Sequence, residues 1–139
     1  MINNLLELFT VRNNRYLKGR LGGGVCLYVR STINYSSRSD LSTKLETVTI
    51  EIRNNRSKPF VASTWYRPLN SLVDIFRFFE AFIGELDSEN MEDWVLGDLN
   101  CNIDAHKPDN DTKSLLNIAN VYGIAPCRLQ ISEPTCIMD

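Results

Sequence analysis

The chain has 139 residues, the length of one domain, and 43% of them are hydrophobic while 23% are charged. This composition excludes a largely disordered chain and favours a single apolar core. A formal net charge of −2 gives no global attraction to a polyanion, so binding to nucleic acid would depend on local basic patches.

The cysteines and the N-terminus bear on the cellular location. Cys26, Cys101, Cys127 and Cys136 contain no Cys-x-x-Cys pair, and with the single histidine they form no zinc-binding spacing. The residues after Met1 lack the basic and apolar regions of a secretory signal, and no run of about 18 apolar residues is present. We therefore expect buried free thiols in an intracellular, reducing compartment.

The first half of the chain predicts β-strands. Residues Thr10–Gly24 are polar, basic and end in glycines, which is typical of a loop or hairpin connection. Alternation of side chains then predicts strands over residues 25–30 and 43–53, the second with apolar residues at 48, 50 and 52. A third strand, Phe60–Tyr66, is stopped by Pro68. Short connections between these strands imply an antiparallel sheet.

The second half predicts two helices around a strand. A helix capped by Asn70 or Ser71 carries an apolar stripe made of Leu72, Ile75, Phe76, Phe79, Phe82, Ile83 and Leu86. Residues 93–100 predict a short strand whose buried part is Trp94–Leu96. Residues 111–123 predict a second helix that ends near Gly123, with a core stripe of Leu115, Ile118 or Ala119, and Tyr122. With a possible strand near residues 129–131, the order predicts a mixed, layered α/β fold.

The end of the strand at residues 93–100 is a candidate for chemistry. Asp98 and Asn100 follow the apolar run and Gly97, and residues two apart lie on the same side of an extended chain. A carboxylate there can act as a general base, and an amide can hold a phosphate oxygen without adding negative charge. The alternative is a turn in which both side chains bond to the local backbone.

A second candidate is the end of the strand Phe60–Tyr66. Tyr66 can donate its phenol hydrogen to an anion, and Arg67 can pair with one. Alternatively, the tyrosine closes the core at a strand end. Thr135, in the segment "SEPT", adds a hydroxyl after a rigid proline.

The motifs together suggest a family. The segments "GGGVCLYVR", "ETVTIEI", "FVASTWYRPLN", "WVLGDLNCNI" and "ISEPT" occur in this order. The run resembles the endonuclease/exonuclease/phosphatase (DNase I-like) family, specifically the apurinic-type endonuclease domain of non-LTR (LINE-type) retrotransposon reverse transcriptase polyproteins. The resemblance covers residues 22–135, after an N-terminal segment and basic loop (1–24) and before an irregular tail (136–139). It implies a four-layered α/β sandwich of two mixed, largely antiparallel sheets packed face to face, with helices outside.

The resemblance also implies an activity, the Mg²⁺-dependent hydrolysis of DNA phosphodiester bonds in the nucleus. Asp98 matches the aspartate that orients or deprotonates the attacking water, Asn100 the asparagine on the scissile phosphate, and Tyr66 the active-site tyrosine. It further implies substrate contacts for Arg67, Asn102 and Thr135.

Two parts of the family pattern have no counterpart in this sequence. The pattern places a metal-binding glutamate upstream of the basic loop and a Ser-Asp-His segment after the threonine, and this chain matches neither. We therefore expect a fragment, incomplete at both ends, that lacks the main protein ligand of Mg²⁺ and has impaired activity. The alternatives are an inactive remnant that at most binds, and a phosphatase-type member of the same fold.

Other polar residues have ordinary explanations. His106 lies in a polar loop, where we expect a solvated side chain. Asp104, Asp109 and Asp111 lack calcium-loop spacing, so a solvated turn is expected there. The basic run of Arg12, Arg15, Lys18 and Arg20 can contact a DNA backbone or form a solvated loop.

Overall fold

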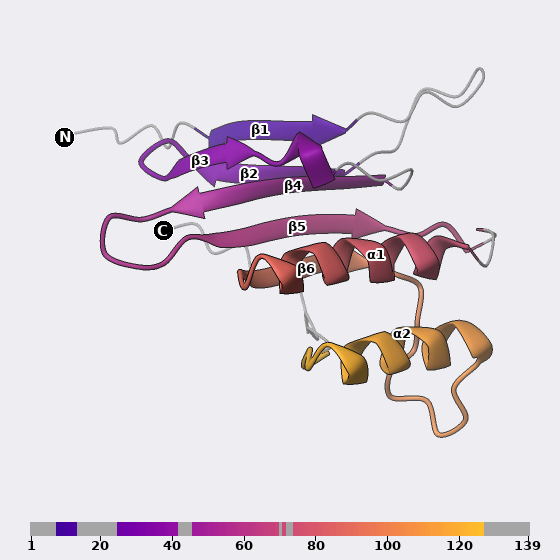
Figure 1. The fold of residues 1–139 in the computed structure, drawn as a ribbon. Helices are drawn as coiled ribbons and strands as arrows, with labels where there is room; N and C mark the ends of the chain where they lie inside the picture. The colour runs from indigo at the N-terminus through magenta and orange to yellow at the C-terminus, as the bar shows by residue number, and fades with distance from the viewer. Residues whose placement is uncertain (1–7, 14–24, 42–45, 70, 72–73, 127–139) are drawn as a thin grey trace, which may run out of the picture. The chain divides into compact units, whose positions relative to one another are not determined.

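The computed structural model describes residues 8–13, 25–41, 46–69, 71 and 74–126. The elements in chain order are β1 (Leu8–Asn13), β2 (Val25–Arg30), β3 (Asn34–Ser37), η1 (Ser39–Leu41), β4 (Glu46–Arg53), β5 (Phe60–Tyr66), α1 (Ile75–Ser88), β6 (Glu92–Asp98) and α2 (Asn110–Val121) (Figure 1). The chain divides into two compact units, Met1–Cys101 and Asn102–Asp139. The predicted mixed α/β content is confirmed.

The strands of the first unit form two sheets. One is a two-stranded antiparallel sheet of β1 and β2, and the other has four strands in the order β3-β4-β5-β6. In the larger sheet β3, β4 and β5 run antiparallel, whereas β6 runs parallel to β5. The strands predicted over residues 25–30 and 60–66 are confirmed at both ends.

Two expectations about these strands are wrong. The strand at residues 25–30 was expected to join the same antiparallel sheet as its successors, but β2 pairs with β1 and β3 takes the place beside β4. Residues 10–13, expected in a loop or hairpin connection, belong to β1. Alternation of side chains marks a buried face but does not identify the neighbouring strand. The sequence therefore did not show that residues 8–13 pair with β2 as a strand.

The two faces of the four-stranded sheet are covered by different elements. On one face Val29 of β2 is buried in a cluster with Ile50 and Ala62, and the half-buried Leu27, Tyr35 and Ile52 pack against it. On the other face the indole of Trp65 makes edge contacts with Phe79 and Phe82 of α1, with ring centroids 5.1 and 4.7 Å away. Because neighbouring residues of a strand point to opposite faces, β5 contributes to both layers.

Helix α1 buries the predicted stripe but begins later than expected. Phe76, Phe79, Phe82, Ile83 and Leu86 are buried, as the helical spacing predicts. The N-cap is Asp74, whose side chain makes no capping hydrogen bond. Ser71 does not cap the helix, because its backbone N–H bonds to Pro68 and its hydroxyl accepts from Arg67. The other candidate cap, Asn70, lies outside the described residues, as does Leu72.

Strand β6 follows β5 through the crossover helix α1, and because the two strands run parallel, both finish at the same end of the sheet. The expectation that Trp94–Leu96 forms the buried part of this strand is wrong for two side chains, since Trp94 is 57% and Leu96 42% exposed. They share one face of β6, which has β5 as its neighbour on one side and stands at the end of the strand order among the described residues. The period of a strand does not reveal that it lies at a sheet edge.

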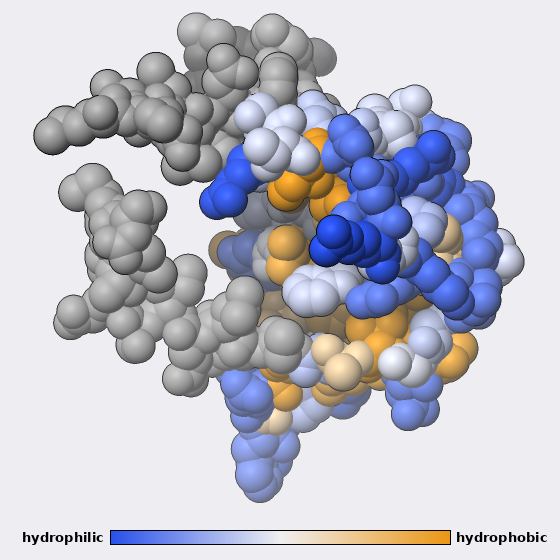
Figure 2. Space-filling model, turned by 90° about the vertical axis from the view of Figure 1, so that its left-hand side faces the viewer, coloured by the Kyte–Doolittle hydropathy of each residue, from blue (hydrophilic) through white to orange (hydrophobic). Residues whose placement is uncertain are grey.

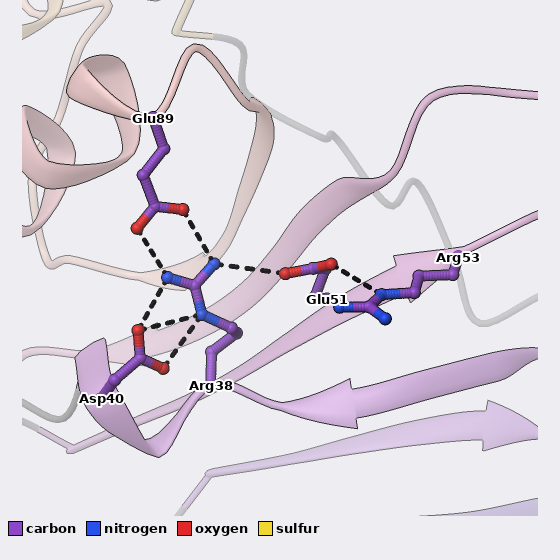
Figure 3. Close-up of polar contacts among 5 residues, drawn as sticks. All are labelled: Arg38, Asp40, Glu51, Arg53 and Glu89. Atoms are coloured by element: carbon purple, nitrogen blue, oxygen red, sulfur yellow. Dashed lines mark hydrogen bonds and ion pairs between the residues drawn. The ribbon is translucent and has the colours of Figure 1, made fainter.

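A cluster of charged side chains joins three parts of the first unit (Figure 3). Arg38, 11% exposed at its side chain, makes ion pairs with Asp40 at 2.7 Å, Glu89 at 2.8 Å and Glu51 at 3.3 Å. Arg53 adds a pair with Glu51 at 2.8 Å. Hydrogen bonds to Asp40 and Glu89 raise the pKa of Arg38, and the same bond with Arg38 lowers the pKa of Asp40. This Arg38 cluster links η1 and β4 to the end of α1.

The second unit contains α2. Asp109 caps this helix, with its carboxylate accepting from the backbone N–H of Thr112 at 2.7 Å. Ile118 and Ala119 are buried as predicted, while Leu115 and Tyr122 are half-buried. Gly123, predicted to follow the last turn, has a φ of 66°, the left-handed geometry that ends helices. The possible strand at residues 129–131 lies outside the described residues.

Candidate functional site

Two of the predicted site residues lie side by side at the end of the sheet where β5 and β6 both terminate. Tyr66 is the register partner of Asp98, each being the last residue of its strand. Tyr66 is 38% exposed, and Asp98 is also exposed. Partners in register point to the same face of a sheet, so the phenol and the carboxylate share one solvent-accessible surface.

Asp98 and Asn100 form a turn held by local bonds. The Asp98 Oδ1 atom accepts a hydrogen bond from the backbone N–H of Asn100 at 2.8 Å. Asn100 adopts a φ of 51°, a left-handed conformation that asparagine tolerates better than most residues. The predicted alternative, in which both side chains bond to the local backbone, holds for Asp98 alone, because the Asn100 side chain donates to the carbonyl of Arg67, 33 residues away in the sequence. The turn has its own local bond at Asp98. It leaves the carboxylate of Asp98 at the surface.

Arg67 lies beneath this turn and is 3% exposed. Its Nε donates to the carbonyl of Leu99 at 2.6 Å, and its Nη2 donates to the carbonyl of Asn100 at 3.0 Å. The backbone N–H of Arg67 donates to the carbonyl of Asp98 at 2.9 Å. In return, the Asn100 side-chain amide donates to the carbonyl of Arg67. The sequence predicted an anion contact for Arg67, whereas in the structure its guanidinium bonds to the backbone of the turn.

Gly97 precedes the turn at a very close approach of two strands. A Cβ atom on this residue would lie 1.9 Å from the backbone oxygen of Trp65, and its φ is 133°. Only glycine accepts both the contact and the conformation at low cost. The position of Asp98 therefore depends on a glycine directly before it.

The register reveals another residue that sequence reasoning missed. Glu46, the first residue of β4, is the partner of Tyr66 across the antiparallel pair, and its carboxylate oxygens are buried. Glu46, Tyr66 and Asp98 thus stand in one row across three neighbouring strands. Strand periodicity contained part of this signal, but the strand pairing had to be known before the row could be seen.

The remaining predicted site residues lie elsewhere. Asn102 belongs to the second unit, where its carbonyl accepts from the N–H of Ala105 at 3.2 Å. Thr135 lies outside the described residues. His106 is exposed in its loop, as expected, and Asp109 caps α2. The structure thus brings together four predicted residues, which are Tyr66, Arg67, Asp98 and Asn100.

The arrangement provides one proton acceptor and two hydrogen-bond donors for chemistry on an anion. The acceptor is the exposed Asp98 carboxylate, which the backbone N–H of Asn100 orients. The donors are the phenol of Tyr66 and the side-chain amide of Asn100. Among the residues that the structure describes, no group of three or more His, Cys, Asp or Glu side chains is arranged to hold a metal ion. The described part of the site therefore supplies proton acceptors and donors but no metal centre.

Other described surfaces are weaker candidates for a functional site. The side on which β4 turns into β5 shows hydrophilic residues with apolar patches between them (Figure 2), and it lies at the opposite end of β5 from Tyr66 (Figure 1). A shallow pocket of about 330 Å³ is lined by Asp74, Arg77, Phe78 and Ala81 of the α1 region. None of the predicted site residues lines it.

Comparison with known proteins adds no relative. No protein-family model matches the chain, and no curated protein is significantly similar to it in sequence. Of the described helices, none is long and apolar enough to span a membrane, and the described cysteines, Cys26 and Cys101, are half-buried. Functional inference therefore depends on the geometry of the site and on the quoted motifs.

Proposed function

We propose that this chain is a DNA endonuclease domain that hydrolyses phosphodiester bonds. The observation that carries the proposal is the pairing of Tyr66 with Asp98 at the carboxyl ends of two parallel strands, with Asn100 two residues further on. Ligands of α/β sheets commonly bind outside the carboxyl ends of parallel strands. The resemblance of "YRP" and "GDLN" to the endonuclease/exonuclease/phosphatase family points to the same residues.

In this proposal Asp98 is the general base. Its Oδ1 atom is fixed by the Asn100 N–H, so the carboxylate has one defined orientation at the surface. A carboxylate held in this way can accept a proton from a water molecule as that water attacks phosphorus. The neighbouring phenol of Tyr66 donates to a phosphate oxygen, which stabilises negative charge in the transition state.

Asn100 orients the phosphate. Its side-chain nitrogen has two N–H groups, one of which donates to the carbonyl of Arg67. The second N–H donates to a phosphate oxygen of the bound DNA. A neutral amide suits this role because it adds no negative charge beside the Asp98 carboxylate.

The family implies Mg²⁺ as cofactor. The described residues do not fit such a centre by themselves, since no cluster of three or more candidate ligands occurs among them. A requirement for Mg²⁺, a nuclear location and the complete four-layered sandwich are parts of the proposal that rest on the resemblance.

Nicking of supercoiled plasmid DNA tests the proposed function. With Mg²⁺ and without EDTA we expect slow conversion to the open circle. Asp98→Ala should lower the rate by about 10²-fold or more, the usual contribution of a general base, and Tyr66→Phe should lower it by a smaller factor. Glu80→Ala is the matched control, because Glu80 is an exposed carboxylate on α1; its rate should equal that of the wild type.

Three results would contradict the proposal. Nicking that survives Asp98→Ala would remove the general base from the mechanism. Absence of nicking by the folded wild-type chain, together with retained DNA binding, would leave the inactive remnant as the explanation. Hydrolysis of p-nitrophenyl phosphate without plasmid nicking would favour the phosphatase branch of the fold.

A further inference from the structure

The pairing of β6 with β5 stops at Asp98, and backbone carbonyl groups continue beyond it in Leu99 and Asn100. The register of β6 with β5 ends at the Tyr66–Asp98 pair, so the sheet offers the next carbonyl groups no ladder partner from β5. Even so, the backbone carbonyls of Asp98, Leu99 and Asn100 all accept hydrogen bonds from Arg67, through N, Nε and Nη2 respectively. One residue thus extends the bonding of the sheet over three successive carbonyls.

The other side of Arg67 is fixed as well. Its Nη1 donates to the hydroxyl of Ser71 at 3.2 Å, and the guanidinium carbon lies 5.2 Å from the ring centroid of Phe76 in α1. A planar guanidinium with five N–H groups can serve these directions together, whereas the point charge of a lysine cannot. The residue type therefore matters beyond its charge.

The conformation that Arg67 supports is costly by itself. Asn100 has a φ of 51°, and non-glycine residues in this region persist where the surroundings hold them there. Its side chain also donates back to the carbonyl of Arg67. Arg67 and the turn of residues 98–100 therefore fix each other.

From these contacts we propose that Arg67 is the positioning residue of the Asp98–Asn100 turn. It acts on the proposed DNA cleavage by placing Asp98 and Asn100, without touching a phosphate itself. Arg67 is 3% exposed, and all three guanidinium nitrogens donate within the protein, Nε and Nη2 to the turn and Nη1 to Ser71. The statement about cleavage rests on the proposed function, whereas the statement about the turn does not.

Nuclear magnetic resonance of the full chain tests the positioning role without any activity. In Arg67→Lys the backbone amide of Asn100 should shift, and its hydrogen exchange should accelerate about tenfold or more. The amides of core residues such as Ile50 and Val61 should keep their protection. Arg77→Lys, which changes an arginine with a side chain 84% exposed, should leave Asn100 unaffected. An unchanged Asn100 amide in folded Arg67→Lys would overturn the proposal.

A measurement on the wild-type chain covers the case in which Arg67→Lys does not fold. The Nε–H of Arg67, bonded to Leu99 at 2.6 Å, should exchange with solvent at least tenfold more slowly than that of Arg77. Equal exchange rates would overturn the proposal. Ser71→Ala, which removes one acceptor of Arg67, should shift the Asn100 amide in the same direction by a smaller amount.

DNA binding and cleavage distinguish a positioning role from a phosphate contact. Arg67→Lys should lower kcat about tenfold or more, since small displacements of catalytic groups are costly, and should leave KM within about twofold.

Lysine keeps the charge, so Arg67→Gln is the variant for salt titrations of DNA binding. Its slope of log binding constant against log salt should equal that of the wild type, whereas loss of a phosphate contact would reduce it by about one. A reduced slope would overturn the proposal. Failure of the wild type to nick DNA would remove the proposed function and leave the resonance result in force.

Discussion

Two arginines with little exposed surface hold different parts of the first unit by different means. Arg38 pairs with the carboxylates of Asp40, Glu51 and Glu89, of which two are more than 40% exposed at their side chains. Arg67 bonds to backbone carbonyls and a hydroxyl, and it is 3% exposed. The acceptors of Arg38 are charged, so salt screens their attraction to the arginine, whereas the carbonyl groups that Arg67 binds carry no net charge. We therefore expect the Arg38 cluster to respond to solution conditions and the turn above Arg67 to resist them.

The largest effect is expected where the turn leaves β6. Gly97→Ala places a Cβ atom 1.9 Å from the oxygen of Trp65 at a φ of 133°. Backbone strain and overpacking of about 1–3 kcal/mol each predict a loss of about 4 kcal/mol in the free energy of unfolding. Urea denaturation measures it. Gly123→Ala is the control, because its Cβ meets nothing within 4 Å, and at a left-handed φ it should cost only about 1 kcal/mol. Equal losses would show that the strand contact is unimportant.

Removal of the second arginine's donors should come next. Arg67→Leu leaves the carbonyls of Leu99 and Asn100 without these donors, and each buried unsatisfied group costs about 1–3 kcal/mol. We expect a loss of about 3 kcal/mol that is the same at pH 3 and pH 7 and in high salt. Chemical denaturation under these conditions checks it. A loss that changes with salt would show that Arg67 acts through charge.

Arg38→Met should cost less and should depend on pH. With one carboxylate nearly buried and two at the surface, we expect a loss of about 2 kcal/mol at neutral pH. The hydrogen bond from Arg38 lowers the pKa of Asp40 from its ordinary value of 3.8. The stabilising contribution of this pair is therefore complete above that value and is lost as the pH falls through the lowered pKa of the folded state. The difference between variant and wild type should shrink below about pH 4, and unfolding curves from pH 2 to 7 would show whether it does.

The smallest effect concerns a carboxyl without such an arginine. Burial, and then the negative charge of Asp87, raises the pKa of Asp93. The folded state thus favours protonated Asp93, and this contribution is lost as the pH rises through the raised pKa. Asp93→Asn should therefore stabilise the chain at pH 7 by roughly 0.5 kcal/mol, with the gain disappearing near pH 3. Thermal unfolding at both pH values measures it, and a loss of stability at pH 7 would contradict the assigned direction.

The two arginines also show what sequence could and could not predict. The strand Phe60–Tyr66 and the buried stripe of α1 were predictable, because alternation and helical spacing are local properties. Asp98, Asn100 and Tyr66 were found at the strand ends where they lie. The role of Arg67 was not predictable, because its acceptors Leu99 and Asn100 are 32 and 33 residues away. No local pattern distinguishes an arginine that binds an anion from one that binds a turn.

Pairing between strands explains the other errors. β3 and the polar part of β1 have little apolar alternation, and their neighbours in the sheets decide their conformation. The exposure of Trp94 follows from its strand standing last in the order of the described sheet. The row of Glu46, Tyr66 and Asp98 likewise exists only once three strands are aligned.

The two tryptophans of the chain are intrinsic fluorescent probes, one for the core and one for β6. Trp65 is 2% exposed among phenylalanine rings, whereas Trp94 is 57% exposed beside Phe60. An indole shielded from water emits at shorter wavelengths than one in contact with it, and iodide quenches only the latter efficiently. The blue edge of the fluorescence spectrum therefore reports on the contact between β5 and α1, and the quenchable red edge reports on β6. Loosening of the strand that carries Asp98 can thus be followed separately from loss of the core, without any added label.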